Sequence, residues 1–168
     1  TNVVDGLGTG SDVTSIYVVQ WGEGKAWMGY PRGSSIGVYH EDMGRKTVTL
    51  PNGLKMVAYE DWFKIHGGLV VEDVKCIGRY ANIETAGTTN TFDEDLLITL
   101  MNLMSDDWAG AGIYCNATIM TQMEIRAKDK TNINYSFAEG LAPGPVLTFK
   151  GVPVRKCEAI LDTEDAIT

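Results

Sequence analysis

The last third of the chain, Gly112 to Ile160, constrains the fold most, because it has the pattern of one continuous supersecondary unit. The apolar run Ile113-Tyr114-Cys115 predicts a buried strand, and Asn116 after it offers a side-chain oxygen to the free N–H groups of a following helix. From Thr118 to Asp129 the apolar residues recur about four apart, as on one face of a helix: Ile119, Met120, Met123 and Ala127.

The unit then returns as strands. Asn132 to Phe137 alternates, which predicts a strand with Ile133, Tyr135 and Phe137 on one face. A loop rich in Gly and Pro follows at 140–145 and leads into a hairpin. The hairpin is predicted from Val146 to Phe149 and from Val152 to Ile160, with its turn at Lys150-Gly151, where Gly can take a positive φ.

This unit resembles a known family. The run Thr148 to Arg155, followed by Ala159-Ile160 and Thr163-Glu164, is similar to the C-terminal end of major capsid proteins of tailed bacteriophages. More narrowly, it resembles the prophage and podophage group related to the capsid protein of the epsilon-type phages. Four further segments look like that group: Ser15–Gly22, Arg79–Ile83, Tyr114–Asn116 and Thr118–Asn132.

The resemblance implies a fold and a function. The expected fold is the α+β capsid fold named for the Hong Kong-97 phage, mostly antiparallel strands with two main helices. Residues 1–168 would be a single domain, the C-terminal portion of a capsid subunit, with the axial domain and part of the peripheral domain. The family's N-terminal arm, extended loop and long spine helix would precede Thr1.

The implied function is structural. The chain would self-assemble into hexamers and pentamers around a genome, would be made in the bacterial host cytoplasm, and would reside in the virion. Its partners would be copies of itself and a scaffolding protein, and no catalytic, cofactor or metal site is expected. Two alternatives from other classes remain open, a β-rich ligand-binding or adhesion module and a small hydrolase.

Length and charge limit the choices further. A chain of 168 residues fits one domain able to bury roughly 70% of its unfolded surface. The net charge of −8 argues against broad contact with nucleic acid, so at most weak contact is expected. A local basic patch stays possible among Arg126, Lys128, Lys130, Lys150, Arg155 and Lys156. The basic residues near Arg126–Lys130 and Arg155-Lys156 are expected to face acidic segments of neighbouring subunits, such as Asp93–Asp95 or Asp106-Asp107.

The first half of the chain is predicted to be rich in strands. Residues 1–12 have the composition of a loop, and Val13 to Trp21 predicts a strand whose hairpin partner is Ala26 to Tyr30. A short strand is expected from Ile36 to His40.

A second hairpin is the strongest local signal in this half. Asn52-Gly53 predicts its turn between Lys46–Leu50 and Leu54–Ile65. Leu69 to Ile83 predicts another long strand. A helix is then predicted at Leu96 to Met104, where Thr91-x-x-Glu94 has the form of a capping box.

Residues that could carry chemistry are dispersed. Gly6-x-Gly8-x-Gly10 lacks the following helix that a phosphate loop needs. His40 and His66 could meet as metal ligands, but no third ligand clusters with them in sequence. The acidic pairs are predicted to lie on the solvated surface: Glu41-Asp42, Glu60-Asp61, Glu72-Asp73 and Asp106-Asp107. The tryptophans are predicted to lie in the core or at interfaces: Trp21, Trp27, Trp62 and Trp108. The cysteines are predicted to be small buried thiols: Cys76, Cys115 and Cys157. No apolar stretch is long enough to predict a membrane span.

Overall fold

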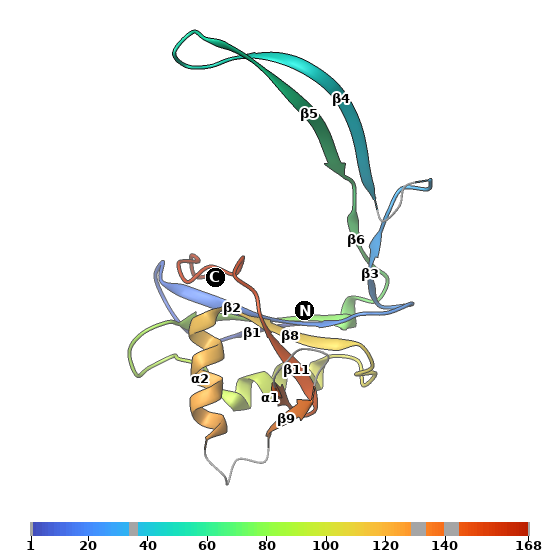
Figure 1. Ribbon diagram of the computed structural model, residues 1–168. Coiled ribbons are helices and arrows are strands. Elements are labelled where there is room, and N and C mark those ends of the chain that lie inside the picture. The colour runs from blue at the N-terminus through green and yellow to red at the C-terminus, as the bar shows by residue number, and fades with distance from the viewer. Residues whose placement is uncertain (1, 34–36, 129–133, 140–144, 168) are drawn as a thin grey trace. The chain divides into compact units, whose positions relative to one another are not determined.

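In the computed structural model, most of the chain belongs to a unit built on a seven-stranded mixed sheet (Figure 1). The structure describes residues 2–33, 37–128, 134–139 and 145–167. The chain divides into two compact units. The sheet unit comprises Thr1–Ala26 and Val71–Thr168, and the hairpin unit comprises Trp27–Val70.

The sheet has the strand order β1-β7-β2-β8-β11-β10-β9. Strands β1 and β7 pair in parallel, as do β8 and β11, and the other four neighbouring pairs are antiparallel. With two α-helices, α1 and α2, this confirms the expected α+β class with mostly antiparallel strands. The strand bounds are Val3–Asp5 (β1), Val13–Gln20 (β2), Ile77–Glu84 (β7), Ala111–Cys115 (β8), Tyr135–Glu139 (β9), Pro145–Phe149 (β10) and Val152–Lys156 (β11).

The strand–helix–hairpin unit is present with small corrections. Helix α2 spans Ala117–Ala127, and the Asn116 side chain accepts a hydrogen bond from the Ile119 N–H at 2.9 Å, as predicted. Strand β11 ends at Lys156 rather than Ile160, because the chain leaves the sheet once its register with β8 is complete. The predictions for Lys130, Asn132, Ile133 and the loop at 140–144 lie outside the described residues.

The turn between β10 and β11 lies at Lys150-Gly151, as the sequence predicts. Lys150 and Gly151 have φ values of +49° and +82°, as a type I′ turn requires at both central positions. The Lys150 N–H donates to the Asn134 carbonyl at 2.8 Å, which ties the turn to the chain before β9.

We expect Gly151→Val to lower the free energy of unfolding by about 1–2 kcal/mol, because a β-branched residue is strained at positive φ. A Cβ at Gly151 would meet no atom within 4 Å, so the loss is conformational and not steric. Urea denaturation measures it, with Gly151→Asn as the control that tolerates this conformation. An unchanged midpoint for the Val variant would contradict the assignment of the turn.

Helix α1 spans Glu94–Leu103, but its cap differs from the prediction. The Asp93 side chain accepts from the Asp95 N–H at 3.1 Å, so Asp93 and not Thr91 is the N-cap residue. Asp93 competes successfully because a carboxylate both accepts the bond and favours the positive end of the helix.

One face of the sheet and both helices form the core (Figure 1). Tyr80 on β7 is fully buried there, its ring 6.4 Å from that of Phe92, and its hydroxyl accepts a hydrogen bond from the Asp93 N–H at 3.2 Å. Other fully buried members are Ile16, Val18, Ile83, Leu97, Leu100, Ile113, Ile119, Met123 and Phe149. In the part of the chain that the structure describes, no helix is long and apolar enough to cross a membrane.

Burial of Tyr80 predicts a loss of stability in alkali. Desolvation raises the pKa of Tyr80 to about 12, above its ordinary value of 10.0. The folded state therefore holds this proton more tightly, so the contribution is complete below pH 10 and is lost as pH rises through about 12. At 1.36 kcal/mol per pKa unit the loss is about 2–3 kcal/mol.

Denaturation between pH 9 and 12 measures this loss, and Tyr80→Phe should show a flatter decline above pH 10. At neutral pH the same variant should be about 1 kcal/mol less stable, because the Asp93 N–H loses its acceptor. Parallel curves for the two proteins would assign the alkaline loss to other groups.

The N-terminal segment is not all loop, which corrects the prediction for residues 1–12. Strand β1 pairs with β7, and beyond it the N–H groups of Gly6 and Gly8 donate to the carbonyls of Ala81 and Asn82 at 2.8 and 2.9 Å. A Cβ at Gly8 would lie 2.4 Å from the Asn82 carbonyl oxygen. These glycines therefore permit close packing of two backbones.

The segment after β11 lies against the sheet unit. Glu164 accepts a hydrogen bond from Ser15 Oγ at 2.6 Å and pairs with Arg79 at 3.1 Å. The Asn82 side chain exchanges hydrogen bonds with the backbone N–H and C=O of Ile167, both at 2.9 Å. Polar side chains, together with backbone hydrogen bonds from Glu164 to Val13 and from Ala166 to Gly10, thus hold this segment in place.

The hairpin unit contains two pairs of strands, and the longer pair is antiparallel. Strand β3 (Ala26–Gly29) pairs with β6 (Gly68–Val71) and not with the 13–21 strand, which corrects the first predicted hairpin. The predicted long strand at 69–83 is interrupted by a 3-10 turn, Val74–Cys76, whose cap is Asp73.

The second predicted hairpin is confirmed and is longer than expected. Strand β4 spans Val38–Thr49 and β5 spans Lys55–Ile65. Leu50 and Leu54 close a three-residue loop: the Gly53 N–H donates to Leu50 at 2.9 Å, and Gly53 has a φ of +80°. Pro51 favours the first position of a type I turn, so Gly53 takes the left-handed position after it.

Candidate assembly surfaces

The β4–β5 ribbon has no core. No residue of β4 or β5 is buried, although many are large and apolar. A two-stranded hairpin alone is marginally stable in water, and apolar side chains gathered on a surface mark an interaction site. The exposed set is Val38, Tyr39, Met43, Val48, Leu50, Leu54, Met56, Val57, Tyr59, Trp62, Phe63 and Ile65.

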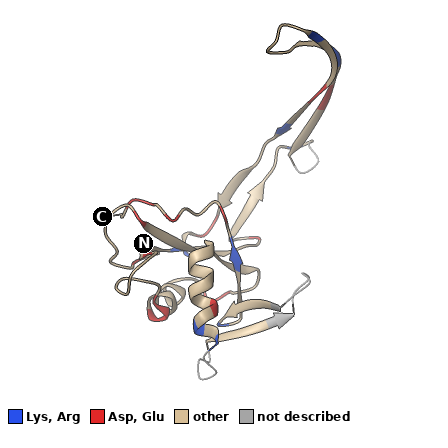
Figure 2. Cartoon of the chain, turned by 60° about the vertical axis from the view of Figure 1, so that its left-hand side comes forward, with Lys and Arg blue, Asp and Glu red and all other residues tan. Residues whose placement is uncertain are grey.

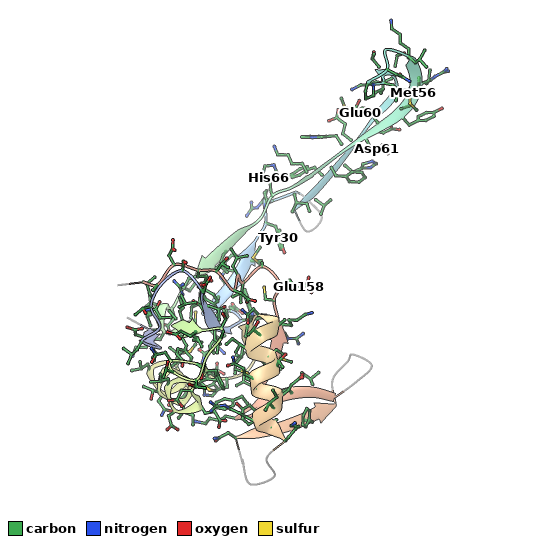
Figure 3. The ribbon with its side chains drawn as sticks, turned by 90° about the vertical axis from the view of Figure 1, so that its left-hand side faces the viewer. Tyr30, Met56, Glu60, Asp61, His66 and Glu158 are labelled. Atoms are coloured by element: carbon green, nitrogen blue, oxygen red, sulfur yellow. The ribbon has the colours of Figure 1, made fainter. Side chains whose placement is uncertain are left out.

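The ribbon has two faces because side chains alternate along each strand. The Tyr59 face carries the odd-numbered residues of β5 and their cross-strand partners, among them Arg45 opposite Tyr59 and Asp42 opposite Asp61. Its apolar side chains are the most exposed on the ribbon: Tyr59 is 81%, Ile65 73% and Phe63 65% exposed. Side chains extend from both sides of the ribbon in Figure 3.

The opposite face, which we call the Trp62 face, carries two acidic and two basic side chains, Glu41, Glu60, Lys46 and Lys64. Lys46 Nζ lies 3.0 Å from Glu60 Oε2. The Lys64 ammonium lies over the Trp62 ring, 5.6 Å from its centroid. This face therefore needs no outside charge to balance it.

On the Tyr59 face, the acidic and basic side chains lie at different positions along the ribbon. Asp42 and Asp61 lie directly opposite one another, and the His40 ring lies 3.4 Å from the Asp61 carboxylate. Arg45 and Lys55, on the same face nearer the turn, form no ion pair within the described residues. Figure 2 shows the same order along the ribbon, with basic residues towards its turn and acidic residues in its middle.

The two units also differ in charge. Residues 27–70 contain five Lys or Arg and four Asp or Glu, a net charge of +1. The remaining residues contain nine Lys or Arg and eighteen Asp or Glu, a net charge of −9.

One ion pair perturbs a carboxyl of the sheet unit. Lys25 Nζ lies 2.8 Å from Asp107 Oδ2, and this hydrogen bond lowers the pKa of the Asp107 carboxyl.

Several basic residues predicted to face neighbouring subunits are engaged within the chain. The Arg126 guanidinium lies 3.5 Å from Glu94, 5.3 Å from the Phe92 ring centroid, and donates to the Phe92 carbonyl at 2.6 Å. Lys156 pairs with Glu158 at 3.0 Å. Arg126 therefore stabilises the fold of its own chain, and its contact with a neighbouring subunit stays a prediction.

Within residues 2–33, 37–128, 134–139 and 145–167, the histidines belong to the hairpin unit, the cysteines to the sheet unit, and the tryptophans are divided between the two. His40 and His66 line one groove of about 370 Å³ on the ribbon, but the described residues contain no group of three side chains able to hold a metal. Trp21 donates to the Tyr114 hydroxyl at 2.8 Å, while Trp62 lies on the ribbon, so these two rings belong to different units. Cys76 and Cys115 are buried free thiols, as predicted, and burial raises the pKa of Cys115 to about 12.

Comparison with known proteins identifies the family. The chain matches the family described as major capsid protein GP7 over residues 1–168. The chain belongs to this family. It is also similar to a chain in the cryo-electron-microscopy structure of bacteriophage Epsilon15, with 25% identity and a TM-score of 0.59 over 99% of this chain and 53% of that one. It thus spans about half the length of that solved chain. No significant match was found among curated proteins.

The family match confirms the resemblance read from the C-terminal residues and extends it over the whole GP7-like chain. Sequence reasoning missed the Tyr59 face. Its signal was present, because Val57, Tyr59, Phe63 and Ile65 all fall on alternate positions of one strand, interrupted only by Asp61.

Proposed function

We propose that this GP7-family chain is a structural subunit of a phage or prophage capsid and assembles with copies of itself into hexamers and pentamers. The family match over residues 1–168 carries the proposal. The ribbon supports it, because an apolar surface with no core in its own chain is what a subunit of an assembly needs. The role is structural, without an enzymatic reaction.

Electron microscopy of the full-length protein, expressed with its scaffolding partner, tests the proposal. We expect closed shells of uniform size. Soluble monomers under all assembly conditions would contradict it. The alternative of a β-rich ligand-binding module gains no specific support from the geometry, because Trp21 and Trp62 belong to different units and form no shared platform for a ligand.

Weak contact with the genome is part of the proposal. The sheet unit carries a net charge of −9, and affinity for duplex DNA depends on cations that neutralise phosphates. We expect no binding tighter than about 10 µM at physiological salt in a mobility-shift titration, a value within the usual range of non-specific binding. Tighter binding that falls steeply with added salt would reveal a concentrated basic face and contradict this expectation.

A further inference from the structure

The Tyr59 face carries a charge pattern that its own hairpin leaves unbalanced. Asp42 and Asp61 face one another across the ribbon, and like charges directly opposite are destabilising. A cation supplied by another molecule would relieve this repulsion. The partner must also cover Tyr59, Phe63 and Ile65, so it must present apolar side chains beside its cation.

We propose that two copies of this chain pair through their Tyr59 faces, with the two hairpins antiparallel about a two-fold axis that passes between Tyr59 and Asp61. A two-fold interface brings the same patch of each copy together, so the patch must be complementary to itself. The order of charges on this face, acidic in the middle and basic towards the turn, meets that requirement.

The register of the ribbon fixes which side chains meet. Same-face residues repeat every two positions, about 6.8 Å apart along a strand. Rotation about the axis therefore places Asp61 and Asp42 against the partner copy's Arg45. One step further out, Phe63 meets the partner copy's Val57. The outermost contact sets Ile65 against the aliphatic stem of the partner copy's Lys55.

Each of these contacts has a physical basis. A guanidinium can bind a carboxylate with two parallel hydrogen bonds, so Arg45 suits the Asp42–Asp61 pair. Tyr59 lies closest to the axis and is the most exposed aromatic of the ribbon, the position at which interface anchors concentrate. Both copies contribute every contact twice, because the arrangement is symmetric.

The acidic sheet unit of another copy is the competing partner. Its charge of −9 would attract Arg45 and Lys55 but would repel the Asp42–Asp61 pair on the same face. A second ribbon satisfies both halves of the pattern. The inference rests on the proposed function in one respect: a shell brings many copies of the chain together. Contacts that are weak between two free copies then act together and strengthen one another.

Charge reversal tests the pairing. The first variant combines Asp61→Lys with Asp42→Asn, which keeps a side-chain oxygen to accept from the Gly44 N–H, and the second combines Arg45→Glu with Lys55→Glu. Sedimentation velocity should show self-association of each variant alone weakened about tenfold or more, since like charges are then opposed. An equimolar mixture should recover the wild-type level, because each variant complements the other. Exchange of the Lys46–Glu60 pair, by Lys46→Glu with Glu60→Lys, is the matched control and should change nothing.

Cross-linking locates the contact independently. Tyr59→Cys in a Cys157→Ser background, treated with a short thiol cross-linker, should give a dimer joined through position 59. Met56→Cys on the Trp62 face should not, and Cys76 and Cys115 are buried. Absence of a dimer joined through position 59, or failure of the mixture to recover association, would overturn the proposal. Shell formation by the full-length charge-reversal variants, seen by electron microscopy, would overturn the pairing and leave the proposed function intact.

Discussion

Replacement of residues 38–65 by a short Gly-Asn-Gly turn is expected to abolish shell assembly and to leave the sheet unit folded. No residue of β4 or β5 is buried, so the replacement removes little folded-state packing, whereas it removes the exposed apolar surface of the ribbon. Electron microscopy of the full-length variant measures assembly, and circular dichroism melting measures folding. We expect no shells and a midpoint within about 5 °C of wild type, a shift corresponding to roughly 1 kcal/mol.

A subtler variant separates loss of the ribbon from loss of its surface. Val57→Thr, Tyr59→Thr and Phe63→Thr together keep residues that favour strands but remove the exposed apolar groups. Assembly should fail here as well. Normal shells from both variants would show that the ribbon plays no part in assembly.

Phe149→Ala should be the most damaging single change in the sheet unit, lowering the free energy of unfolding by about 3–5 kcal/mol. Phe149 on β10 is fully buried, and its ring packs edge-on against Tyr135 at 5.1 Å between centroids. Its loss leaves a cavity that the strands around it cannot close. Since a domain of this size is stable by about 5–15 kcal/mol, the variant should be partly unfolded at 37 °C.

Phe137→Ala is the matched control, because Phe137 lies on the neighbouring strand β9 and is 59% exposed. Urea denaturation of the two variants should differ by at least about 2 kcal/mol, given the usual small effect of surface substitutions. Equal losses of unfolding free energy in the two variants would mean that β9 and β10 do not pack as they do in this structure.

Local signals predicted local structure well. Asn116 caps α2 because its side chain reaches the free N–H three residues on, and Lys150-Gly151 turns because glycine tolerates positive φ. The Thr91 cap failed for a local reason, since Asp93 is the stronger competitor two residues later. Each of these features depends on a few consecutive residues.

Pairing between distant segments could not be predicted in the same way. The composition of Ala26 to Tyr30 allows it to pair with either neighbour, and its actual partner, β6, begins at Gly68. The parallel pairing of β8 with β11 likewise joins segments separated by a helix and a hairpin. Strand propensity says that a residue suits a pleated surface, and it does not say which strand lies beside it.

The candidate surface depends on one such detail. The ribbon register shifts between Asp42 and Arg45, where Gly44 has a φ of +72° and its N–H donates to Asp42 Oδ1 at 2.7 Å. This bulge sets Arg45 on the same face as Asp61. A regular ladder would have put Arg45 on the other face, so the charge pattern could not be derived from the hairpin signal alone.

Cryo-electron microscopy of shells formed by the full-length protein tests most directly whether the β4–β5 ribbon is an assembly surface. We predict ordered density for residues 38–65 in every subunit, with Tyr59, Phe63 and Ile65 covered by a neighbouring copy. Closed shells in which these side chains remain exposed to solvent would contradict the central claim.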